Sequence, residues 1–187
     1  MDKLRAEALA NEQGEVYKGF THAFWAFTKG PSMTQTLSIM ESETEESQAL
    51  EVFNLILTYA GLNTDTSSSE AGGGGGQHQP QQQQQQQTDE NDHVLLIQTV
   101  LDKAMKRDCH INELFLQLVK QTTDHPEPNS RVNLRHWSLV ALACSVILPV
   151  DKLTRKYLLA HLKKCSADFV TEEGKYARFA EKVRTRL

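Results

Sequence analysis

The sequence predicts an all-α fold of about seven or eight helices, and two observations support this prediction. The first is the ten-residue stretch 139–148, in which only Ser145 is polar. A helix that is apolar on nearly every face has to be surrounded by other elements, and ten residues are too few to span a bilayer, which takes about 20. The second is that the flanking segments are apolar on one helical face only. We therefore expect 139–148 to be a central helix that is enclosed on all sides.

The N-terminal region predicts two elements before the first clear break. Residues 2–12 are expected to form a short helix capped by Asp2. Residues 17–27 hold five aromatic side chains, and because each of them can bury a large area, we expect this segment to pack against the core. Gly30 and Pro31 then interrupt regular structure.

The next helix is predicted to begin after Ser42 and to stop at Gly61. Ser42 and Glu45 form an S-x-x-E capping box, in which each side chain satisfies a free backbone N–H group. Glu43, Glu45 and Glu46 place negative charge where the helix dipole favours it. Gly61 is suited to the left-handed conformation that ends many helices.

Residues 63–92 are expected to be a disordered, low-complexity insertion in a single domain that spans residues 1–187. The insertion contains five consecutive glycines and a glutamine tract at 81–87, with almost no apolar side chain to bury. A helix capped by Asp92 should follow it. The residues of that helix that are spaced for burial are Leu95, Leu96, Thr99, Val100 and Ala104.

Amphipathic helices are predicted on both sides of the central one. The preceding helix has Asn112 as a cap near its start, and it ends before Pro126 and Pro128, which remove backbone donors. The following helix begins after Pro149, with Asp151 as its cap. The last helix begins at Thr171. The apolar stripes of these three helices are Ile111, Leu114, Phe115 and Leu118; Leu153, Tyr157, Leu158 and Leu162; and Tyr176, Phe179, Ala180, Val183 and Leu187.

Charge is unevenly distributed along the chain, although the net charge is only −4. Residues 131–187 hold 12 Lys and Arg against 5 Asp and Glu, whereas residues 1–130 hold 8 against 19. Such a separation predicts a basic face for an acidic partner. The alternative is that the two charged halves neutralise each other across the fold.

The candidate partner-binding residues are basic. Most of them lie in the last two helices, where they form either a solvated face or a surface that attracts an acidic partner such as a tubulin tail or a cargo peptide. Lys120, at the end of its helix, either contacts such a partner or interacts with the terminal backbone carbonyls. The full candidate set is Lys120, Lys152, Arg155, Lys156, Lys163, Lys164, Arg178 and Lys182.

Sequence motifs for catalysis, cofactors and nucleic acid are missing. The pairs His161 and Cys165, and Cys109 and His110, suggest a metal site, but zinc needs four matched ligands, or three and a water, and that spacing does not occur. The glycines at 72–76 lack the Lys-Ser/Thr pair of a phosphate-binding loop, and the negative net charge disfavours nucleic acid. We expect no enzymatic activity, no metal and no cofactor.

The cellular compartment follows from the cysteines and from the length of the apolar runs. Three cysteines, an odd number without framework spacing, fit free thiols in a reducing environment. No apolar run reaches the length of a membrane span, and no signal peptide is recognisable at the N-terminus. We expect a cytoplasmic protein without a transmembrane segment.

Several of these features occur in a particular order along the chain. The order is the aromatic segment, the turn Lys29-Gly30-Pro31, the helix end Tyr59-Ala60-Gly61, the variable insertion, the segment ELFLQLVKQT at 113–122, the proline turn, WSLVAL at 137–142, Pro149, Lys156-Tyr157-Leu158 and Tyr176-Ala177-Arg178-Phe179. This order resembles the myosin tail homology 4 domain, which is found in the tails of unconventional myosins, plant calmodulin-binding kinesins and some Rho GTPase-activating and pleckstrin-homology proteins.

The resemblance implies a superhelical bundle that captures cargo proteins or microtubules, normally together with a FERM domain, which is absent from this chain. We therefore expect a non-catalytic, cytoskeleton-associated adaptor with cytoskeletal or cargo proteins, tubulin among them, as partners. The alternative is a helical trafficking adaptor that binds acidic lipid head groups or peptides. Two departures from the family pattern are Ile111-Asn112 in place of Arg-Asp, and His136 in place of Gly.

Overall fold

The computed structural model describes residues 36–62 and 82–186, and these residues form an all-α fold. The predicted fold class is confirmed. The expected helix at 2–12 and the aromatic segment at 17–27 lie outside the described residues. The elements are six α-helices and a turn of 3-10 helix: α3 (Glu43–Ala60), α4 (Gln82–Ala104), α5 (Asp108–Gln121), α6 (Arg131–Val146), α7 (Lys152–Ser166), α8 (Glu172–Val183) and η1 (Arg184–Arg186).

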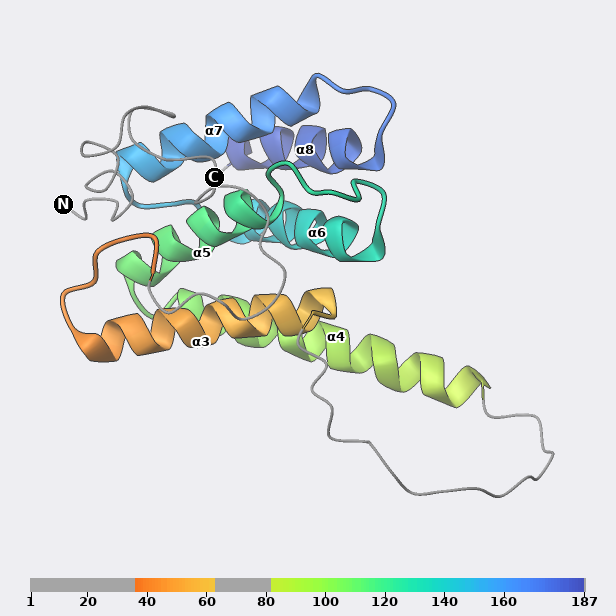
Figure 1. The fold of residues 1–187 in the computed structure, drawn as a ribbon, viewed down its shortest axis with the longest axis horizontal. Coiled ribbons are helices and arrows are strands. Elements are labelled where there is room, and N and C mark those ends of the chain that lie inside the picture. Colours follow the sequence, from red (N-terminus) through yellow and green to blue (C-terminus); the bar gives the residue numbers. More distant parts are fainter. Residues whose placement is uncertain (1–35, 63–81, 187) are drawn as a thin grey trace.

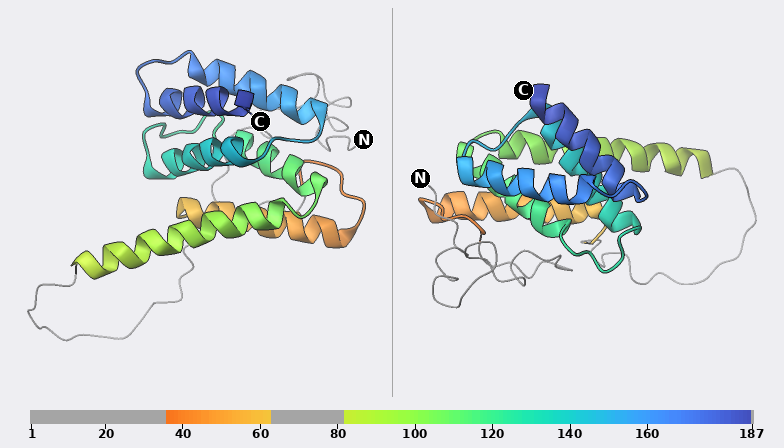
Figure 2. Two further views of the ribbon diagram at one scale, coloured as in Figure 1. Left: turned by 180° about the vertical axis from the view of Figure 1, so that it is seen from behind. Right: turned by 90° about the horizontal axis from the view of Figure 1, so that it is seen from above.

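The helices stack in three layers of two, α3 with α4, α5 with α6, and α7 with α8 (Figure 1). Figure 2 shows the same layers from behind and from above. Helix α5 joins the first layer to the third, because it packs against α3 and α4 on one side and against α7 on the other. Helix α6 packs against α3, α5 and α8. The sequential pairs therefore form a continuous stack with one shared core.

Both predicted ends of α3 are confirmed. The Ser42 side chain accepts a hydrogen bond from the Glu45 N–H at 3.2 Å. At the other end Gly61 has φ 85°, and the N–H groups of Gly61 and Leu62 bond to the carbonyl oxygens of Thr58 and Leu57, both at 2.9 Å. This pair of bonds satisfies carbonyls that the end of a helix leaves unpaired.

Helix α4 begins ten residues earlier than predicted. Its first residue is Gln82, within the glutamine tract, whereas the expected cap was Asp92. Glutamine has a good helix propensity, and extending an existing helix costs little once its first turn has formed. The segment predicted to be disordered, 63–92, is therefore helical from Gln82 onward, and its remainder lies outside the described residues.

The enclosed helix is α5 and not, as predicted, the stretch 139–148. Eleven of the 14 residues of α5 are buried. Helix α6 keeps an open side, on which Leu142 is 41% exposed and Val146 is 49% exposed. These two residues lie one turn apart on the single face of α6 that no other described helix covers. Apolar composition alone did not reveal this, because single apolar residues on a surface are common.

Asn112 does not cap α5, which starts four residues earlier, at Asp108. Its side chain is buried and points to the start of another helix. The Oδ1 atom of Asn112 accepts hydrogen bonds from the N–H groups of Val150 and Asp151, at 2.9 and 3.0 Å. Asn112 therefore fixes the approach to α7, a role that joins residues almost 40 positions apart.

Candidate functional site

Lys120 is separated by the fold from the other basic candidates. It lies near the C-terminal end of α5 with 4% of its surface exposed. Burial removes water from the ammonium group and lowers the pKa of Lys120 to about 8. A side chain enclosed in this way cannot reach the surface of a partner, so we exclude Lys120 from the basic face.

Helix α7 supplies most of the exposed candidates. Its sequence contains five Lys and Arg and no Asp or Glu. Leu158 and Leu162 are buried, and the helix packs against α5 and α8. The N-terminus of α7 is fixed by Asp151, whose carboxylate accepts a hydrogen bond from the Thr154 N–H at 2.9 Å. The apolar stripe predicted from the sequence thus faces the core, and the basic residues lie outside.

Three lysines of α7 carry charges that no side chain of the described residues neutralises by an ion pair. Lys152, Lys156 and Lys163 are exposed, and none of them forms an ion pair or hydrogen bond with a residue in 36–62 or 82–186. Their spacing of four and seven residues places them on one face of the helix. We call these three lysines the α7 basic face.

The other two basic residues of α7 have partners. The Nε atom of Arg155 donates a hydrogen bond to the carbonyl oxygen of Pro149. The Nζ atom of Lys164 lies 3.8 Å from the carboxylate of Asp124. Both side chains remain exposed to solvent. Arg155 and Lys164 are therefore accessible, but each is partly engaged within the domain.

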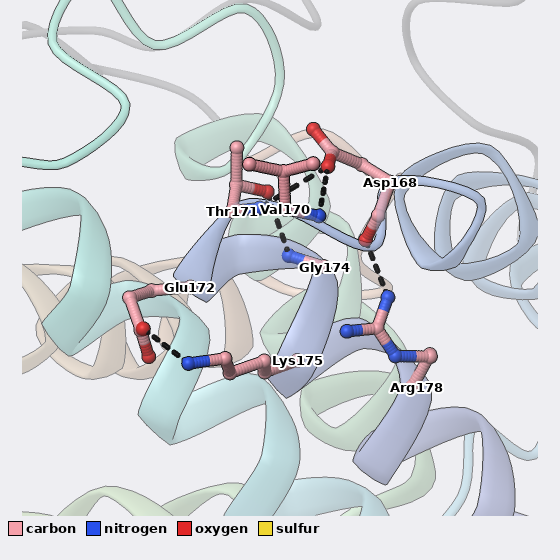
Figure 3. Close-up of polar contacts among 7 residues, drawn as sticks. All are labelled: Asp168, Val170, Thr171, Glu172, Gly174, Lys175 and Arg178. Atoms are coloured by element: carbon pink, nitrogen blue, oxygen red, sulfur yellow. Dashed lines mark hydrogen bonds and ion pairs between the residues drawn. The ribbon is translucent and has the colours of Figure 1, made fainter.

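Helix α8 is less basic than its pattern suggested. It carries three basic residues, Lys175, Arg178 and Lys182, and an equal number of glutamates. The Nη1 atom of Arg178 donates hydrogen bonds to the backbone carbonyl of Ser166, at 3.2 Å, and to that of Asp168 (Figure 3). Arg178 thus braces the connection between α7 and α8. Lys182 is exposed.

No sequence pattern indicated how the buried Trp137 is held. Its Nε1–H donates a hydrogen bond to Glu173 Oε2 at 3.1 Å. The ring of His161 stacks on it, with 5.2 Å between ring centroids and 8° between planes. His161 Nε2 in turn lies 2.8 Å from Thr122 Oγ1. This cluster joins α6, α7 and α8 to the end of α5. Its residues are too far apart in the sequence for a local pattern to predict their contacts.

Burial sets the protonation of the titratable groups around this cluster. It lowers the pKa of His161 to about 4 and raises the pKa of Cys165 to about 11. It also raises the pKa of the Cys144 thiol to about 12. At neutral pH the imidazole is uncharged and both thiols are protonated, so the thiols are poor nucleophiles. In the part of the chain that the structure describes, no three His, Cys, Asp or Glu side chains are grouped to hold a metal ion.

Residues 97–187 match the family model of the MyTH4 domain. The C-terminal part of the chain is thus similar to a MyTH4 domain. The recognition of a myosin tail homology 4 domain from the sequence is thereby confirmed. The Myosin-I heavy chain of Dictyostelium discoideum is 26% identical over 138 residues, which are 73% of this chain and 5% of that relative. The chain thus spans a small fraction of the length of this myosin.

Solved structures of MyTH4-FERM domains have a fold similar to that of this chain. A structure of the MyTH4-FERM MF1 domain of Dictyostelium discoideum myosin VII, mutant 2, has a TM-score of 0.67 and 20% identity, covering 96% of this chain and 32% of that chain. The MyTH4-FERM MF2 domain of the same myosin has a TM-score of 0.64 and 14% identity, covering 97% of this chain and 33% of that chain. Within the described ranges, no helix is long and apolar enough to cross a membrane.

Proposed function

We propose that this MyTH4 domain is a non-catalytic adaptor module that docks an acidic partner, a cargo protein or a microtubule, on the basic face of α7. The observation that carries the proposal is that α7 has five Lys and Arg and no Asp or Glu. Lys152, Lys156 and Lys163 present three uncompensated charges on one side of a helix that is firmly packed. Charges arranged in this way raise the rate at which an acidic surface associates.

The accessible residues beside the α7 basic face extend this surface. Arg155 and Lys164 lie on the same helix, and Lys182 is exposed on the neighbouring α8. Arg178 contributes indirectly, by fixing the connection between the two helices. We therefore assign partner contact to the lysines and to Arg155, and a positioning role to Arg178.

A FERM domain is the second component of the proposed function. The solved structures with a similar fold are MyTH4-FERM domains of myosin VII, in which a MyTH4 domain occurs together with a FERM domain. The chain described here covers about a third of each of them. We propose that the domain acts with a FERM domain in a cytoplasmic, cytoskeleton-associated protein of the myosin type.

Microtubule co-sedimentation tests this proposal. The variant Lys156→Gln/Lys163→Gln should lose about thirtyfold in affinity, since each of the two charges near an oppositely charged surface contributes on the order of 1 kcal/mol. Raising the salt to about 0.15 M, where the Debye length is about 8 Å, should weaken binding further. Lys103→Gln/Lys106→Gln, at the C-terminal end of α4 and just beyond it, is the matched control, because it removes the same charge elsewhere and should change affinity little.

The results of that experiment separate the two kinds of acidic partner. If neither the α7 variant nor the added salt changes the affinity for microtubules, the role of the α7 basic face is overturned. The second candidate function, docking on acidic lipid head groups, is favoured by the same lysines. If the partner is a lipid surface, the Lys156→Gln/Lys163→Gln variant should lose affinity for phosphatidylserine vesicles in a flotation assay, whereas pelleting with microtubules should not depend on these lysines.

A further inference from the structure

The loop between α7 and α8, residues 167–171, is braced from both sides (Figure 3). Asp168 Oδ1 accepts hydrogen bonds from the N–H groups of Val170 and Thr171, at 2.8 and 3.1 Å. The Thr171 hydroxyl accepts a bond from the Gly174 N–H at 3.2 Å, and Arg178 donates to the Asp168 carbonyl. A loop with this many internal bonds is held in one conformation.

The same loop exposes two large apolar side chains. Phe169 is 76% exposed and Val170 is 90% exposed, more than any other large apolar residue of the described ranges. The Arg178 guanidinium lies over one face of the Phe169 ring, 4.6 Å from its centroid, so that the ring is fixed while its other face meets water. A rigid, exposed aromatic side chain loses little conformational entropy when a partner covers it, and residues of this kind are common anchors of interfaces.

A cavity of about 390 Å³ opens beside this loop. Lys164 and Cys165 line it before the loop, and Glu173 lines it after the loop. Its other walls come from the end of α5, the α5–α6 connection and α7. The apolar and aromatic lining residues there are Val119, Pro128, Tyr157, Ala160 and His161. The volume falls in the range of sites that receive a small ligand or a side chain.

Two segments beside this cavity are acidic, in contrast to α7, although Lys164 itself lines the cavity. The segments 124–130 and 167–173 lie side by side at one end of the bundle (Figure 1) and contain five Asp and Glu but no Lys or Arg. Two of these carboxylates, Asp124 and Glu172, pair with lysines. The other three, Glu127, Asp168 and Glu173, form no ion pair with a described residue.

We propose that the α7–α8 loop and the adjacent cavity are a second docking site, for a partner peptide that carries apolar side chains next to Lys or Arg. An apolar side chain of the peptide packs on Phe169 or enters the cavity, and its basic neighbours face Glu127, Asp168 and Glu173. Charge complementarity selects this peptide over an acidic one, which the carboxylates of these two segments repel. The site uses none of the three lysines of the α7 basic face, although Lys164 lines the cavity, so the test of one docking surface does not decide the other.

Amide chemical shifts measured by NMR on the isotope-labelled domain test this site. Two blocked tetrapeptides serve as probes, acetyl-Leu-Arg-Phe-Arg amide and its acidic counterpart acetyl-Leu-Glu-Phe-Glu amide. We expect the basic peptide to bind with a Kd below about 1 mM and to shift amides of the loop and the cavity wall, including Phe169, Val170 and Tyr157. The acidic peptide should cause no saturable shift.

Variants with matched controls identify the contacts. Phe169→Ser should weaken the basic peptide about tenfold or more, because a large apolar contact is lost, while Phe179→Ser, another exposed apolar residue of this region, should leave it unchanged. Glu127→Gln/Glu173→Gln should weaken the peptide about fivefold, and Gln at position 173 still accepts the hydrogen bond from Trp137. The charge-matched control is Glu41→Gln/Glu43→Gln at the start of α3.

Several results would overturn the proposal. They are equal binding of the two peptides, shifts that centre on the outer face of α7, and an unchanged affinity in Phe169→Ser. Absence of any saturable shift up to several millimolar of the basic peptide counts against it equally. Microtubule pelleting of Phe169→Ser should match that of the unchanged domain, which keeps the two docking surfaces apart.

Discussion

Replacing Gly174 by alanine is expected to destabilise the domain, although alanine is the better helix-forming residue. Gly174 is buried in the first turn of α8, and its N–H takes part in the cap formed by Thr171. At an unobstructed helical position the same substitution would stabilise by about 1 kcal/mol. The sign of the effect therefore reports whether the α7–α8 loop sits as close to α8 as the structure shows.

The magnitude follows from the space around Gly174. A Cβ atom built on it would lie 1.8 Å from the carbonyl oxygen of Asp168 and 2.9 Å from the carbonyl carbon. Ordinary contacts between such atoms need about 3.5 Å, so the loop would have to retreat by about 1.5 Å. Overpacking of this kind costs about 1–3 kcal/mol, and loss of the Thr171 cap costs about 1 kcal/mol. After the gain in helix propensity, a net loss of about 1–3 kcal/mol remains.

Urea unfolding followed by circular dichroism measures this loss. Lys175→Ala is the control, because it changes the adjacent exposed residue and should alter the free energy of unfolding by less than about 0.5 kcal/mol. The domain with Gly174→Ala should unfold at a clearly lower urea concentration with a similar slope. A variant as stable as the parent, or more stable, would refute the close approach of the loop and with it the rigidity on which the second docking site depends.

Two further predictions concern the buried polar groups. Glu113→Gln should destabilise the domain by about 1–3 kcal/mol in urea unfolding. The Glu113 carboxylate accepts hydrogen bonds from the N–H groups of Leu37 and Ser38, both at 2.8 Å, whereas an amide would turn its own donor toward one of them. The control Glu127→Gln changes an exposed residue and should leave the stability unchanged. His136 is fully buried, and burial lowers its pKa from 6.5 to about 3. The unfolded chain therefore takes up a proton on this imidazole at a higher pH than the folded domain does. The stability that the neutral imidazole provides is present at pH 7 and falls below about pH 6.5, by about 2 kcal/mol at pH 5. A pH dependence of unfolding between pH 7 and 5 that is the same in His136→Gln would contradict this assignment.

The helices themselves were largely predictable because the signals that define them are local. Ser42 and Asp151 were expected as caps, and each accepts the predicted type of hydrogen bond from its own first turn. The last helix was expected to begin at Thr171, which is the N-cap of α8. Gly61 was expected as a stop for the same reason, since one residue with positive φ suffices to end the helix. Errors arose where a local pattern was continued too far or not far enough. The glutamines before Asp92 lack apolar residues, yet they extend α4.

The candidate site was predictable only in part. The absence of acidic residues in α7 and its apolar stripe can be read from the sequence, and together they predict an exposed basic face. The burial of Lys120 could not be read in this way, because it depends on which helices cover α5. Neither could the stacking of His161 on Trp137 or the braced loop around Phe169, which unite residues from separate helices.

The sequence by itself determined the helical class, most of the helix ends and the orientation of the amphipathic helices, because spacing and capping act within a few residues. Only the tertiary structure decided that α5 rather than α6 is enclosed, that Asn112 serves a neighbouring helix, and that carboxylates gather at one end of a chain whose C-terminal part is basic. These features depend on which distant segments meet. The burial of a side chain, its pKa and the shape of a cavity depend on how distant segments pack together, so they cannot be read from any single segment.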